Sequence, residues 1–101
     1  MHVADLDEVT YDLEVDGDLV RRTLHRRVFE RGAWATVVLA FEEKRPDGTW
    51  KPAKLALVRL QKVHDAWKKA AGMTLPGHDA AELARTITAW GLDDLADASD
   101  E

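Results

Sequence analysis

The chain has 101 residues, of which 46% are hydrophobic and 33% are charged. This length allows one modest hydrophobic core. Because small domains bury a low fraction of their surface, many are stabilised by contact with a partner subunit. There is no cysteine, which excludes disulfides and thiolate metal sites. The N-terminal residues carry no apolar run and no stretch could span a membrane, so we expect a cytoplasmic protein.

The net charge of −5 hides a segregation of charge along the chain. All 14 Lys and Arg, with seven of the 19 acids, lie within residues 21–90, which therefore carry +7. Residues 1–20 hold seven acids and residues 91–101 hold five, with no Lys or Arg in either. A basic centre between acidic ends indicates a surface that binds polyanions and that the acidic ends could screen. The alternative interpretation is that the acidic ends only keep a small protein soluble.

Alternation of apolar and polar residues predicts the first strands, over 11–15 and 19–29, with a tight turn at Asp16-Gly17 between them. On the second strand the even-numbered residues are half apolar, whereas the odd-numbered ones are mostly basic. The odd set is Arg21, Thr23, His25, Arg27 and Phe29. The clearest strand is Trp34–Glu43, because β-branched and aromatic residues dominate it.

A turn at Arg45-Pro46-Asp47-Gly48 follows, since Pro presets φ and Gly accepts a positive φ. Lys54–Val63 alternates poorly, and a bulge within it would switch its parity. We expect a short hairpin loop at 64–66 and a further strand over 67–75.

From about His78 the spacing of the apolar residues becomes that of a helix, with Leu83, Ile87 and Trp90 on one stripe. Gly91 follows, as a C-terminal helix cap would. We expect Trp90, which lies on this stripe, to pack in the core. The predicted fold is α+β, a twisted antiparallel sheet of four to five strands followed by one C-terminal α-helix. The predicted parts are an acidic segment at 1–10, one domain at 11–91 and an acidic tail at 92–101.

Catalytic motifs are missing from the sequence. The only serine is Ser99, the four histidines lack metal-ligand spacing, and the glycines are scattered at turns rather than gathered in a phosphate loop. We therefore expect no enzyme, no metal and no cofactor.

The stronger signal is basic side chains interleaved with aromatics on strands. Single-stranded nucleic acid favours this pairing, because cations track phosphates and flat rings accept unstacked bases. The alternative is that the tryptophans are core residues and the charges are ordinary solvated ones. The candidate nucleic-acid-binding residues are Arg21, His25, Arg27, Phe29, Arg31, Trp34, Trp50, Lys51, Lys54, Trp67 and Lys68.

Several segments together resemble the transcriptional positive cofactor four family of single-stranded DNA-binding coactivators, and the related Whirly proteins. They are Arg27-Val28-Phe29-Glu30-Arg31-Gly32, the hydrophobic strand up to Lys44, the Asp47-Gly48 turn, Lys51-Pro52-Ala53-Lys54, and Met73-Thr74-Leu75-Pro76-Gly77 with its helix. The resemblance covers about two-thirds of the chain. It departs from the family at residues 55–71, which form an apparent extra hairpin.

The resemblance implies a homodimer whose helices pack at the interface through Leu83, Ile87 and Trp90, with curved sheets presenting a basic ridge to DNA. Arg27, Phe29 and Arg31 match the first-strand ridge, and Lys51 and Lys54 match the Lys-Pro region. We therefore expect a sequence-tolerant single-stranded nucleic-acid-binding protein, with DNA favoured over RNA as its ligand, in transcription, replication or repair. The alternative is a non-catalytic protein-interaction module of the same fold that has lost nucleic-acid binding.

Overall fold

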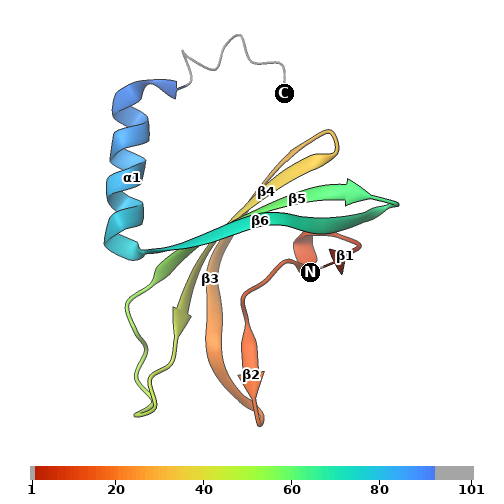
Figure 1. Cartoon of the computed structure of the whole chain (residues 1–101). Helices are drawn as coiled ribbons and strands as arrows, with labels where there is room; N and C mark the ends of the chain where they lie inside the picture. Colours follow the sequence, from red (N-terminus) through yellow and green to blue (C-terminus); the bar gives the residue numbers. More distant parts are fainter. Residues whose placement is uncertain (1, 93–101) are drawn as a thin grey trace.

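The computed structural model describes residues 2–92, and within them one curled antiparallel sheet carries a single α-helix at its end (Figure 1). The elements are β1 (His2–Val3), η1 (Leu6–Glu8), β2 (Leu13–Val15), β3 (Asp18–Arg31), β4 (Trp34–Glu43), β5 (Lys54–Val63), β6 (Ala66–Pro76) and α1 (Gly77–Trp90). Neighbours in the sheet follow the order β1-β6-β5-β4-β3-β2. The α+β class is confirmed.

The sheet has six strands rather than the four to five expected. The additional strand is β1, whose two residues are too few to show an alternating pattern. The bounds of β4 and β5 are those predicted, and the turn at Asp16-Gly17 has the positive φ angles of a tight hairpin turn. All of the predicted acidic tail except Leu92 lies outside the described residues.

Two irregularities in strand pairing decide which side chains share a face. Between β3 and β4, Thr23 pairs with Phe41 and His25 with Ala40, so Leu24 is an extra residue. Between β5 and β6, Arg59 pairs with Ala71 and Leu60 with Lys69, so Ala70 is extra. Each extra residue reverses the parity of its strand. The bulge expected in β5 therefore lies in β6, and β5 pairs with β4 without interruption.

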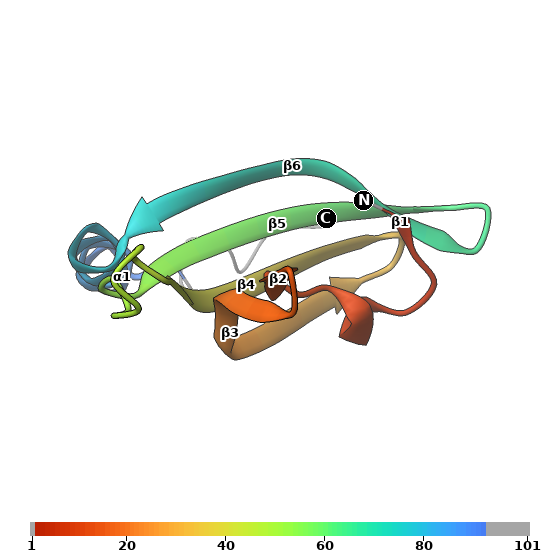
Figure 2. The same ribbon diagram turned by 90° about the horizontal axis from the view of Figure 1, so that it is seen from below.

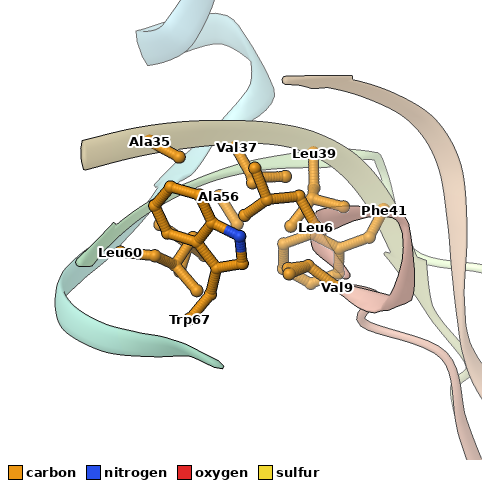
Figure 3. Close-up of a cluster of buried hydrophobic side chains, with 10 residues drawn as sticks. Leu6, Val9, Ala35, Val37, Leu39, Phe41, Ala56, Leu60 and Trp67 are labelled. Carbon is orange, nitrogen blue, oxygen red and sulfur yellow. The ribbon is translucent and has the colours of Figure 1, made fainter. Parts of the chain in front are cut away.

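One face of the sheet holds the hydrophobic core (Figure 3). Alternate residues of β4 and β5 point into it, and Trp67 of β6 covers them from the sheet edge. The buried residues are Leu6, Val9, Ala35, Val37, Leu39, Phe41, Ala56, Val58, Leu60 and Trp67. Leu6 and Val9 do not belong to the sheet; they come from the segment ahead of β2.

We call residues 4–12 the strap, because they cross this face from one sheet edge to the other. The preceding strand, β1, pairs with β6, and the following strand, β2, pairs with β3. The strap is fastened by Arg26, which donates hydrogen bonds to the Asp7 and Val9 carbonyls. The acidic N-terminal segment therefore covers what we call the strap face of the sheet.

The helix α1 follows directly on β6 and lies at one end of the sheet, at the left in both views (Figures 1 and 2). At its start, a Cβ on Gly77 would lie 2.6 Å from the Ala53 carbonyl oxygen, so glycine is needed there. Gly91 caps its end in the left-handed conformation, as predicted. No residue of the helix is buried, and Trp90 is 64% exposed, so the expectation that Trp90 packs in the core of its own chain is wrong.

Candidate nucleic-acid interface

The face opposite the strap, which we call the open face, carries most of the predicted binding residues. Strand register assigns its members, because residues directly opposite each other in a sheet point to the same side. They are Arg22, His25, Arg27, Phe29 and Arg31 of β3, Trp34, Thr36, Val38, Ala40 and Glu42 of β4, Leu55, Leu57, Arg59 and Gln61 of β5, and Lys68, Ala71, Met73 and Leu75 of β6.

The open face divides into two parts along its strands. At the end near the β3–β4 turn, one row across the sheet reads Arg31, Trp34, Gln61 and Lys68. The next row reads Phe29, Thr36, Arg59 and Ala71. We call Arg27, Phe29, Arg31, Trp34, Arg59 and Lys68 the basic–aromatic cluster. Beyond it, the face becomes apolar on β5 and β6.

Within the cluster, arginines lie on the aromatic rings. The guanidinium carbon of Arg59 is 4.9 Å from the ring centroid of Trp34, and that of Arg27 is 5.0 Å from the centroid of Phe29. Phe29 is 52% exposed and Trp34 is 37% exposed. These distances are those of cation–π contacts. The exposed rings are therefore held in place by cations that a polyanion would also contact.

A second arginine–aromatic pair lies at the other end of β3. The guanidinium carbon of Arg22 is 4.0 Å from the ring centroid of Trp50, and Arg22 also forms an ion pair with Glu42 at 2.7 Å. Lys44 approaches the same ring at 5.8 Å and pairs with Asp18. Carboxylates therefore neutralise the cations at this end of β3.

A shallow hollow of about 320 Å³ lies beside the cluster. Its lining includes Thr36, Leu57, Arg59, Ala71 and Met73, and it is predominantly apolar. An apolar hollow edged by an arginine can receive a planar, partly polar group, because the ring stacks on the apolar wall and the guanidinium meets its polar edge.

Three predicted binding residues lie on the strap face instead. Trp67 is 4% exposed and is part of the core. Arg21 precedes the Leu24 bulge, so it points away from His25 and Arg27, and it donates to the Tyr11 carbonyl oxygen at 2.7 Å. Lys54 pairs with Glu43 at 2.7 Å. The sequence analysis placed Arg21 on the same face as His25 and Arg27 because the extra residue Leu24 was not visible to it.

The Lys54 ammonium lowers the pKa of Glu43, chiefly through the hydrogen bond between the two side chains. Lys51 is exposed in the loop before β5 and lines a pocket with Arg45 and Lys54, away from the cluster. Of the predicted set, the structure therefore brings together Arg27, Phe29, Arg31, Trp34 and Lys68, with His25 adjacent on β3 and Trp50 at the far end.

Two arginines of the open face were not among the predicted binding residues. Arg22 has the parity of the half-apolar set of β3 and reaches the open face only because Leu24 is extra. Arg59 shares its parity with Leu55 and Leu57, which hid it within an apolar pattern. The uninterrupted pairing of β5 with β4 places Arg59 opposite Thr36, one row from Trp34 on the same face.

Within residues 2–92 no helix is long and apolar enough to cross a membrane, and no group of three or more metal-ligating side chains is gathered. No family model, curated protein or solved structure matches this chain.

Proposed function

We propose that this chain is a sequence-tolerant single-stranded nucleic-acid-binding protein, with DNA the favoured ligand, that acts without catalysis in transcription, replication or repair. The observation that carries the proposal is the basic–aromatic cluster. Four cations, Arg27, Arg31, Arg59 and Lys68, surround two exposed rings on one face of a sheet. Cations would neutralise the phosphates and the rings would stack on the bases.

The distribution of acids supports the same face. On β3 to β6 the open face carries two carboxylates, Glu42 and Asp18, which are paired with Arg22 and Lys44. On the strap face, by contrast, Arg26 and Lys54 are paired with Asp7 and Glu43. On β3 to β6 the open face therefore carries more cations than carboxylates, Arg27, Arg31 and Lys68 among them, and a polyanion would meet an excess of positive charge there despite the overall charge of −5. The resemblance to the positive cofactor four family favours the same ligand.

The test is a fluorescence-anisotropy titration of a labelled oligonucleotide, single-stranded and duplex, across a range of salt concentrations. We expect tighter binding of the single strand, with an affinity that falls with salt at a log–log slope of about −0.7 per phosphate contacted. A double Arg27→Ala, Arg31→Ala variant should lose most of the binding, whereas Lys62→Ala, on the strap face, should retain it. Absence of binding at low salt would overturn the proposal.

The second candidate is a protein-interaction module that has lost nucleic-acid binding. Within residues 2–92, ion pairs between Arg or Lys and a carboxylate favour it, because they remove basic charge from the surface; they include Arg22–Glu42, Arg26–Asp7, Lys44–Asp18 and Lys54–Glu43. Arg27, Arg31 and Lys68 of the basic–aromatic cluster are not among these cations. The same titration separates the two functions, since the module would bind neither single strand nor duplex.

We also propose that the chain forms a homodimer through α1. The stripe of Leu83, Ile87 and Trp90 is 36%, 39% and 64% exposed, and an isolated helix of 14 residues is marginally stable in water. A second copy would bury this stripe and complete a small core. Sedimentation velocity of the full chain and of Leu83→Lys tests this: the wild type should be a dimer and the variant a monomer.

A further inference from the structure

The two long free edges of the sheet differ in charge. Beyond its pairing with β2, the free edge of β3 runs over residues 24–31 and carries Arg26, Arg27, Glu30 and Arg31. Charged side chains on an edge strand oppose pairing with another strand. The β3 edge is therefore protected in the usual way.

The outer edge of β6 lacks this protection. Among residues 2–92, only β1 pairs with it, at Trp67 and Lys68, and Figure 2 shows β6 as the margin of the sheet along the rest of its length. Residues 70–76, Ala-Ala-Gly-Met-Thr-Leu-Pro, contain no charge, and Met73 is 54% exposed. Lys69, the neighbouring cation, extends along the strap face over Gly72. The pairing of β1 already shows that this edge accepts an antiparallel strand.

We propose that two copies of the chain pair through the outer edges of β6, antiparallel and centred on Met73, so that their sheets become continuous. The proposal deepens the homodimer proposed above by naming a second contact, and it does not depend on nucleic-acid binding. The helix that carries the proposed interface begins directly after Pro76, so both contacts lie along one side of the chain.

Symmetry restricts the possible registers. In a two-fold dimer each residue must oppose a residue that points to the same side of the sheet, because opposed residues of antiparallel strands always do so. The centre must then be one residue facing its own copy. The bulge at Ala70 limits the regular part of β6 to residues 71–76. Centring the pairing on Met73 opposes residue 71 to residue 75 and residue 72 to residue 74, all of which lie within this regular part.

This register makes the junction apolar on the open face. Met73 opposes Met73, and Ala71 opposes Leu75 in both directions, so no charged side chain lies across the joint on that face. Apolar cross-strand pairs of this kind stabilise antiparallel sheets, and a second copy of the chain supplies the partner residue of each pair. The two open faces then lie on the same side of the joined sheet.

The chain has no cysteine, so in a single-cysteine variant a disulfide can form only between the introduced cysteines of two copies. Directly opposed residues of antiparallel strands have Cα atoms about 4.5–5.5 Å apart, which is within the range that a disulfide spans. Full-length Met73→Cys should therefore form a covalent dimer under mild oxidation. Leu24→Cys is the matched control, because Leu24 is 40% exposed on the opposite edge strand, and it should stay uncrosslinked.

Two further arms test the register and separate the proposals. A mixture of Ala71→Cys and Leu75→Cys should crosslink, and neither should do so alone. Met73→Lys and Met73→Glu should each be monomeric, and their mixture should be dimeric.

If the wild type is a dimer but Met73→Cys crosslinks no faster than Leu24→Cys, the β6 pairing is wrong and the helix dimer stands. If the wild type is a monomer at all concentrations, both fail.

Discussion

The guanidinium of Arg59 lies over the indole ring of Trp34, 4.9 Å from the ring centroid, while its Nη1 donates to Thr36 Oγ1 at 3.0 Å. The arginine comes from β5 and the ring from β4, and Thr36 lies directly opposite Arg59 in the sheet. A base that stacks on this side of the ring must replace the guanidinium or stack on its outer surface. In both cases Trp34 and Arg59 act together in the proposed binding.

Replacing Trp34 should weaken binding of a single-stranded oligonucleotide. Stacking of one base on an aromatic side chain contributes about 1–3 kcal/mol, so Trp34→Ala should raise the Kd roughly 5- to 150-fold, and Trp34→Phe should raise it less. Anisotropy titrations at one fixed salt concentration measure both variants. Equal affinities for Trp34→Ala and wild type would show that the ring does not contact a base.

Replacing Arg59 should change the salt dependence of binding. If the guanidinium contacts one phosphate, Arg59→Ala should reduce the magnitude of the log–log salt slope by about 0.7. Lys62→Ala is the matched control, because Lys62 has its side chain on the strap face, near Trp67, and its removal should leave the slope unchanged. Equal slopes for both variants would place Arg59 outside the interface.

The sequence predicted the elements better than the faces. The bounds of β4 and β5 were predicted to the residue, although β5 alternates poorly, and in the middle of each strand alternate residues are buried. Alternation could not locate the extra residues Leu24 and Ala70, since a bulge changes pairing without changing composition. Arg21 was consequently placed on the wrong face.

The aromatic residues show the same limit. Trp34 and Trp67 both lie on strands beside basic residues, and the sequence treats them alike. The strap decides between them, because Leu6 lies over the face that Trp67 shares and leaves the face of Trp34 open. The acidic character of residues 1–10 concealed the two apolar positions, Leu6 and Val9, by which they pack in the core.

Trp67 should matter for stability rather than binding. Its side chain is buried, and removal of a buried tryptophan side chain costs about 3–5 kcal/mol, so Trp67→Ala should lower the free energy of unfolding by that amount. Urea denaturation followed by circular dichroism measures the change. Trp67→Phe should be destabilised less and should bind an oligonucleotide as the wild type does. A loss of affinity in folded Trp67→Phe would contradict the assignment of Trp67 to the core.

The strap should contribute to stability through Leu6. Leu6 is 5% exposed, and truncation of a buried leucine costs about 2–5 kcal/mol, so Leu6→Ala should shift the urea midpoint strongly. Leu13→Ala is the matched control, because Leu13 is 43% exposed and its truncation should change stability by less than about 0.5 kcal/mol. Similar midpoints for the two variants would show that the strap does not cover the core in solution.

The Glu43–Lys54 pair should make stability depend on acid pH. The pKa of Glu43 is lowered from its ordinary value of 4.5, mainly because its carboxylate accepts a hydrogen bond from Lys54 Nζ at 2.7 Å. A carboxyl whose pKa is lower in the folded state stabilises the fold above its unfolded pKa, and this contribution is lost as the pH falls through the folded pKa. The free energy of unfolding of the wild type should therefore fall below pH 4.5 more steeply than that of Glu43→Gln.

Lys54→Gln should flatten the pH profile of stability in the same way. The double variant should differ little from either single variant, because each single change already removes the pair. Urea titrations at a series of pH values measure all four proteins, and parallel profiles for wild type and Glu43→Gln would show that the pair does not form in solution.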